Sequence, residues 1–98
     1  MSPHFHRLTE LDRLIHEPGR LAIVSLLSAV EEADFLYLLK ETGLTKGNLS
    51  SHLAKLEAVK YIVIEKTYRG KIPMTLCKLT PMGRGAFKLY RAALKASL

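Results

Sequence analysis

The chain has 98 residues, a formal net charge of +6 and a single cysteine, Cys77. This length fits one domain, a lone cysteine excludes an intramolecular disulfide and fits a reducing compartment, and no apolar run approaches the ~20 residues of a membrane span. The charge is uneven, because residues 1–44 hold four Lys/Arg and seven Asp/Glu whereas residues 45–98 hold eleven and two. We therefore expect a cytoplasmic protein without a membrane partner, whose basic half binds a polyanion.

The N-terminal part of the chain predicts two helices separated by a break. The first covers residues 8–16 and aligns four apolar side chains: Leu8, Leu11, Leu14 and Ile15. Pro18 ends this helix and suits the first turn of the next one, where its missing N–H has no partner to lose. The second helix, residues 18–30, is apolar on most sides and should be the most buried.

Residues 33–59 carry the pattern of a helix-turn-helix. An amphipathic stretch over residues 33–42 ends at Gly43, which supplies the left-handed backbone of a helix terminus. Thr45 can then cap a following helix with its hydroxyl. In that helix, which we expect over residues 45–59, three leucines recur four and three residues apart and share one face: Leu49, Leu53 and Leu56.

The opposite face of this last helix suits the major groove of DNA. Its side chains are short, cationic or able both to donate and to accept hydrogen bonds, and its first acid is Glu57. A major groove admits one helix when its outward side chains let the backbone come close. We expect the following residues to face DNA: Thr45, Lys46, Gly47, Asn48, Ser50, Ser51, His52 and Lys55. His52 keeps two interpretations, a DNA contact or packing of its ring at the junction of helix and hairpin.

After residue 59 the pattern changes to that of strands, and a hairpin is expected over residues 61–79. Residues 61–64 are rich in β-branched side chains, and residues 74–79 form the second expected strand. The polar residues between them should form the tip, which carries Lys66, Arg69 and Lys71. We expect all three cations to contact DNA. Phosphate contacts, which give affinity without sequence information, should come mostly from Lys55, Lys60, Arg69 and Lys71.

The last expected helix covers residues 81–96, with Thr80 as its cap and Pro81 at its first position. It has two adjacent apolar rows: Met82, Ala86, Leu89 and Ala93 in one, and Phe87, Tyr90 and Leu94 in the other. One apolar row suffices to pack a helix on its own domain. The second row should therefore face water in a single chain and close a homodimer. We assign to that interface Leu8, Leu11, Ile15, Phe87, Tyr90 and Leu94.

These elements predict a mainly α fold with a small β-hairpin, a winged helix-turn-helix. Residues 18–24, 44–56, 70–71 and 79–84 resemble winged-helix regulators of the ArsR/MarR type, and most closely the small stand-alone winged helix DNA-binding domain group. The most specific segments are Leu-x-x-His-Leu-x-x-Leu at 49–56 and Leu-Thr-Pro-x-Gly-Arg at 79–84. The resemblance implies a homodimer joined by its terminal helices, one recognition helix per half-site, and wings that reach the flanking minor groove. Metal-sensing ArsR proteins have cysteines in the first helix of the helix-turn-helix, and residues 35–39 have none.

We therefore expect a sequence-specific regulator of transcription that binds double-stranded DNA and is not an enzyme. No catalytic constellation with a supporting motif and no phosphate-binding glycine loop occurs, and we expect neither a cofactor nor a metal. Cys77, flanked by Leu76 and Leu79, should be a buried and inert thiol. The alternative is a winged-helix module that binds another protein and no DNA, which has no need for an acid-free start of the recognition helix. Whether a small-molecule effector exists is left open.

Overall fold

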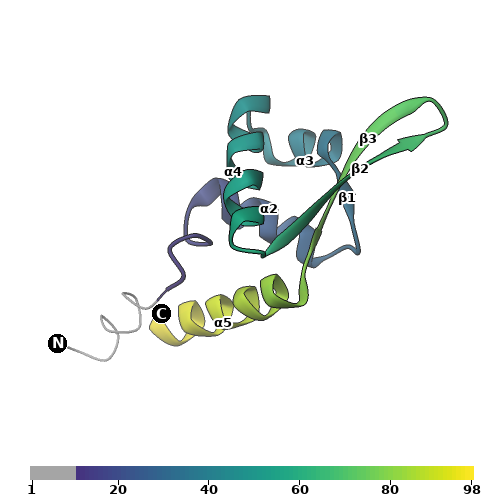
Figure 1. Ribbon diagram of the computed structural model, residues 1–98. Helices are drawn as coiled ribbons and strands as arrows, with labels where there is room; N and C mark the ends of the chain where they lie inside the picture. Colours follow the sequence, from purple (N-terminus) through teal and green to yellow (C-terminus); the bar gives the residue numbers. More distant parts are fainter. Residues whose placement is uncertain (1–10) are drawn as a thin grey trace.

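The computed structural model describes residues 11–98, in which a group of helices is followed by a long hairpin and a final helix (Figure 1). The elements are, in order, α2 (Pro18–Ser28), β1 (Ala33–Asp34), α3 (Phe35–Thr42), α4 (Lys46–Ala58), β2 (Ile62–Arg69), β3 (Ile72–Leu79) and α5 (Pro81–Ser97). The strands form one antiparallel sheet in the order β1–β3–β2. The predicted fold class, mainly α with a small hairpin after a helix-turn-helix, is confirmed.

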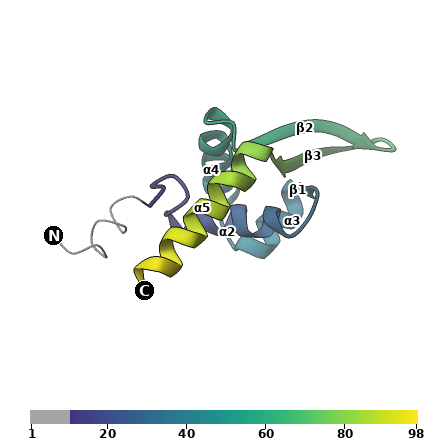
Figure 2. The same ribbon diagram turned by 90° about the horizontal axis from the view of Figure 1, so that it is seen from below.

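The core lies where α2, α3 and α4 meet the base of the sheet. Its largest fully buried side chains are Ile15, Ile23, Val24, Leu27, Leu38, Leu49, Leu56, Ile62 and Cys77. Helix α2 is central, as its apolar sequence predicts. The hairpin projects away from the helices in both views, so its outer half does not pack on the core (Figures 1 and 2).

The prediction of a helix over residues 8–16 is wrong for the residues that the structure describes, because residues 11–17 form turns. The carboxylate of Asp12 accepts hydrogen bonds from the amides of Leu14 and Ile15, at 2.9 and 3.2 Å, which closes a tight turn. Pro18 then disfavours helical backbone at Glu17, which is extended and caps α2. Leu8, assigned to the dimer interface, lies outside the described residues.

The sheet is larger than the sequence predicts. Strand β2 continues to Arg69 and β3 begins at Ile72, so the turn consists of Gly70, with φ of 63°, and Lys71. Lys66 therefore lies within β2 and pairs with Thr75, instead of lying at the tip. A second difference is β1, which replaces the first turn of the helix expected over residues 33–42 and pairs with β3.

Candidate nucleic-acid interface

Helix α4 is built as the sequence predicts. The hydroxyl of Thr45 accepts a hydrogen bond of 3.1 Å from the amide of Asn48, and Gly43, with φ of 68°, ends α3 in the left-handed region. The three leucines of α4 are buried, so the helix is fixed with its polar face outward. Exposed on that face and at its start are Thr45, Lys46, Gly47, Asn48, Ser50, Ser51 and Lys55. The first amides of α4 also lie at this surface, and a helix N-terminus favours anions such as phosphate.

His52 differs from its neighbours on α4, because its side chain is only 17% exposed. Its Nδ1 atom lies 3.3 Å from Oε2 of Glu17 and 3.1 Å from Nη1 of Arg20. The ring therefore packs at the N-terminal end of α2, and not at the junction of helix and hairpin that one of our two interpretations gave. A DNA contact of His52 stays a prediction.

Glu17 connects this cluster to α2. Its two carboxylate oxygens accept hydrogen bonds from the amides of Gly19 and Arg20, at 2.8 and 3.0 Å, and so cap the helix. Desolvation alone would raise the pKa of Glu17. The two amide bonds and the positive charge of Arg20 outweigh it, so that the pKa lies below its ordinary value. Glu17 is therefore an anion at neutral pH that joins the start of α2 to α4.

The sequence analysis missed this cluster, because His52 lies more than thirty residues from Glu17, Gly19 and Arg20. One sequence signal was Gly19. It lies in the first turn of a helix, where the backbone does not require a glycine. A Cβ at that position would lie 2.7 Å from Nε2 of His52, which is closer than atoms pack. Such a glycine indicates close approach of another group to the backbone.

The wing carries the second group of expected contacts. Arg69 and Lys71 flank Gly70 at the tip, Lys66 lies further down β2, and all three cations are exposed. Among the described residues, Arg20 is the only Lys or Arg that forms an ion pair within 4.0 Å, and its partner is Glu17. The chain from residue 66 to its end holds eight Lys/Arg and no acid. Apart from Glu65 near the base of β2, the charged side chains of the projecting wing are therefore cations, and this surface attracts polyanions.

Helix α5 buries the row that we expected to face water. Leu11, Ile15, Phe87 and Tyr90 are all buried within the single chain, so that expectation is wrong. The reason is the folded N-terminal segment, whose His16 places Nδ1 2.7 Å from the hydroxyl of Tyr90 and helps to cover this side of α5. Leu94 is half-buried. The large apolar side chains that α5 exposes are Met82 and Leu89, at 58% and 73%.

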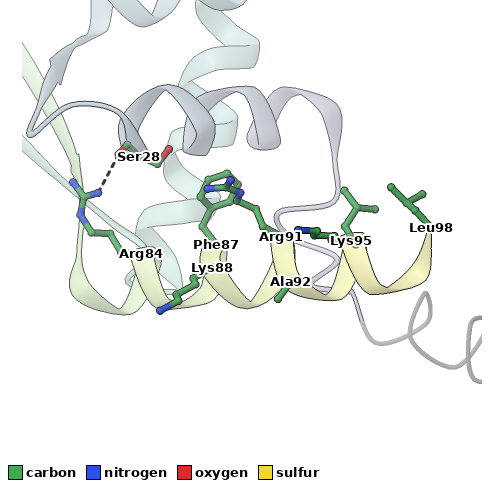
Figure 3. A pocket seen from close by; sticks show the side chains of 9 residues that line it. Ser28, Arg84, Phe87, Lys88, Arg91, Ala92, Lys95 and Leu98 are labelled. Carbon is green, nitrogen blue, oxygen red and sulfur yellow. Dashed lines mark hydrogen bonds between the residues drawn. The ribbon is translucent and has the colours of Figure 1, made fainter.

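A third face of α5 is basic and borders a hollow of about 690 Å³ beside the end of α2 (Figure 3). Its cations recur four, three and four residues apart: Arg84, Lys88, Arg91 and Lys95. Arg84 donates to the carbonyls of Ser28 and Val30, at 3.2 and 3.1 Å, and so satisfies the end of α2. Figure 1 shows α5 along the side of the molecule away from the start of α4 and the wing tip. This face is therefore not part of the surface formed by α4 and the wing.

Other kinds of site find little support within residues 11–98. This part of the chain contains no cluster of three potential metal ligands. Its helices are also too short or too polar to cross a membrane. Cys77 is buried as predicted, and burial, with smaller contributions from Glu57 and Asp34, raises the pKa of its thiol to about 11. The thiol is therefore protonated and unreactive at neutral pH.

Known proteins share this arrangement. Residues 20–98 match the sequence model of a family described as winged helix DNA-binding domain. An uncharacterised protein of Methanocaldococcus jannaschii is 40% identical over 79 residues, which are 80% of this chain and 85% of that protein. A transcriptional regulator homologue of Pyrococcus horikoshii superposes with a TM-score of 0.87 at 27% identity, over 97% of this chain and 93% of its own. A MarR-family regulator of Silicibacter pomeroyi, at 19% identity and covering 96% of this chain and 62% of its own, shares the fold with a TM-score of 0.68.

Proposed function

The chain belongs to the winged helix DNA-binding domain family, and we propose that it regulates transcription by reading double-stranded DNA sequence-specifically as a homodimer. The observation that supports this most is the outer face of α4. That face exposes short polar and cationic side chains while the leucines behind it are buried. A helix with this surface can enter a major groove.

Base readout in this proposal comes from three side chains of the first two turns of α4. Lys46, Asn48 and Ser51 are all exposed. A lysine can donate to the O6 and N7 atoms of guanine, and an asparagine can form two hydrogen bonds with N6 and N7 of adenine. A serine hydroxyl can bond to a donor or to an acceptor on a base edge. The helix therefore offers a mixed donor and acceptor pattern, which is what discrimination between base pairs needs.

In this proposal, phosphate contacts come from four cations: Lys55, Lys66, Arg69 and Lys71. Thr45 and Gly47, at the start of α4, would lie close to the DNA backbone. The cations lie on two separate elements, α4 and the wing, and none forms an ion pair with another described residue. Contacts from both elements would fix the register of the protein on the duplex and carry no sequence information.

A test of DNA binding is the affinity for a random duplex at several salt concentrations. Each phosphate contact adds about 0.9 to the slope of log affinity against log salt. We expect Arg69→Ala and Lys71→Ala each to lower this slope by roughly one unit and to weaken binding to all sequences about equally. Lys88→Ala, on the basic face of α5, is the matched control and should leave the slope unchanged. Absence of binding by the wild type even at low salt would contradict this proposal and favour the alternative, a winged-helix module that binds another protein.

The dimer would use the exposed row of α5. Met82 and Leu89 are the large apolar side chains of this row, and Gly85 and Ala92 beside them are small, so a second helix could approach closely. Pairing across a two-fold axis lets each such surface cover its own copy. To bind successive major grooves, such a dimer must hold its two recognition helices about 34 Å apart. Phe87, Tyr90, Leu94, Leu11 and Ile15 would support this surface from within the chain.

Sedimentation equilibrium tests the dimer. Leu89→Glu should give a monomer at micromolar concentration, because dimerisation would bury a charge without a partner. Leu36→Glu on α3 is the matched control, since Leu36 is 69% exposed, close to the 73% of Leu89, and it should leave the dimer intact. A monomeric wild type, or a dimeric Leu89→Glu variant, would contradict the interface on α5.

A further inference from the structure

We propose that His52 is a positioning residue of the recognition helix. In this proposal its ring, held between Gly19, Arg20 and Glu17, sets the rotation of α4 about its own axis and therefore the direction of Asn48 and Ser51. The proposal rests on the proposed function of α4. Beyond that function, it names residues that would determine specificity without contacting DNA.

The buried leucines of α4 do not by themselves fix the rotation of the helix about its own axis. Apolar contacts are non-directional, so the buried side chains Leu49, Leu53 and Leu56 decide which face is inward without fixing the angle sharply. Hydrogen bonds weaken steeply away from their preferred angle. His52 supplies such a bond at the flank of α4, next to the exposed Ser51 and the buried Leu53.

Arg20 makes the anchor of this bond rigid. Its Nε donates to the carbonyl of Leu14 at 2.6 Å, and its side chain is only 12% exposed. Its Nη1 lies 3.1 Å from Nδ1 of His52 and 3.6 Å from Oε2 of Glu17. Because a guanidinium can only donate, Nδ1 of His52 is the acceptor. The ring is therefore attached to a side chain that is itself fixed to the capped start of α2.

Gly19 supplies the other wall of the site. A Cβ there would lie 2.7 Å from Nε2 and 2.9 Å from Cδ2 of His52. The backbone of Gly19 is not in the left-handed region, so alanine is compatible with its conformation. Gly19→Ala therefore displaces the far end of the His52 ring and, to a lesser degree, crowds Oε1 of Glu17, which lies 3.3 Å from the added Cβ. It removes no polar group and no cation of the protein.

The experiment is a double-mutant cycle of Gly19→Ala and His52→Ala, with affinity measured on the duplex that the wild type selects and on a random duplex. We expect each single variant to lose about tenfold on the selected site, a magnitude typical of coupling between contacting residues, and nothing on random duplex. The double variant should nearly match His52→Ala alone, because the two closest contacts of a Cβ at residue 19 are with the His52 ring. His52→Asn, which retains a polar atom near the place of Nδ1, should recover part of the loss.

The measurements are made where thermal unfolding shows every variant to be folded, so that a loss of stability alone cannot imitate the result. Equal losses on both duplexes, with a salt slope about one unit lower for His52→Ala, would make His52 a phosphate contact and overturn the proposal. Additive losses in the double variant, or unchanged discrimination in both single variants, would also overturn it. Failure of the proposed function is distinguishable, because it shows in the wild type as the absence of DNA binding.

Discussion

The two long helices of the basic half, α4 and α5, expose different chemistry. Helix α4 exposes short polar and cationic side chains and no large apolar one before Val59 at its end, whereas α5 exposes Met82 and Leu89. A polar face such as that of α4 can bind a hydrated polyanion, since wet interfaces are the rule with DNA. An apolar row such as that of α5 marks contact with protein. In the function that we propose, this difference would separate recognition on α4 from assembly on α5.

The two helices meet at Tyr61. Its amide donates to the carbonyl of Leu56 at the end of α4, and its carbonyl accepts from the amide of Thr80 at the start of α5, both at 3.0 Å. Its hydroxyl donates to Asp12 at 2.6 Å. A change at this junction should therefore affect both helices, whereas a change on one outer face should affect one function only.

The largest effect is expected where α5 lies against this junction. A Cβ at Gly83 would overlap the backbone carbonyl of Tyr61, which cannot move aside. We expect Gly83→Ala to destabilise the fold by about 3 kcal/mol, the upper range for overpacking. Gly85→Ala, two residues away with open space around it, should stabilise by about 0.5–1 kcal/mol through helix propensity. Urea unfolding compares them, and equal stability of the two variants would contradict the close contact at Gly83.

A smaller effect is expected at the hydroxyl of Tyr61. The hydrogen bond to Asp12, followed by burial, raises the pKa of Tyr61 to about 12. Because this pKa lies above the ordinary value of 10, the bond stabilises the fold fully below pH 10 and less as the pH rises to 12. At neutral pH, Tyr61→Phe should be less stable to unfolding than the wild type by about 1 kcal/mol. As the pH rises from 10 to 12, the stability of the wild type should fall more than that of the variant. Tyr68→Phe on the exposed wing is the control, and an identical alkaline profile in wild type and Tyr61→Phe would refute the bond.

The smallest effect is expected just after α4. Lys60 has φ of 64°, which is the left-handed region and costs a non-glycine residue roughly 1–2 kcal/mol. Lys60→Gly removes this strain but adds chain entropy to the unfolded state, so we expect a gain of about 0.5–1 kcal/mol. Lys55→Gly, the same substitution inside α4, should instead lose about 1 kcal/mol. Thermal unfolding measures both, and a loss at both positions would contradict the strained backbone at Lys60.

The sequence predicts α4 well because its signals are local. Thr45 caps the amide of a residue only three positions away, and the leucine spacing marks one face without reference to any other element. The same holds for Gly43, whose left-handed backbone ends α3. Local chemistry also marked the cations of the wing tip, although the strands extend further toward it than their composition predicts.

Contacts between distant residues are what the sequence could not provide. Strand β1 is only two residues long and exists because Ala33 and Asp34 pair with β3 more than forty residues away. The buried row of α5 was assigned wrongly, because the N-terminal segment that covers it forms turns and not a helix. His52 contacts Glu17 and Arg20 through the same kind of distant packing. In each case the residue types are compatible with several partners, and the three-dimensional arrangement selects one.

The central claim is that α4 reads base pairs, and the most direct test is selection of binding sites from a random duplex pool by the wild type and by Asn48→Ala. Asn48 is exposed and forms no side-chain hydrogen bond with another described residue, since only its amide bonds to Thr45. We predict a pseudo-palindromic site for the wild type, and for the variant a loss of about 1–3 kcal/mol with relaxed preference at one base position in each half-site. An identical selected site for both proteins would contradict base readout by Asn48, and a pool without enrichment would contradict sequence-specific binding altogether.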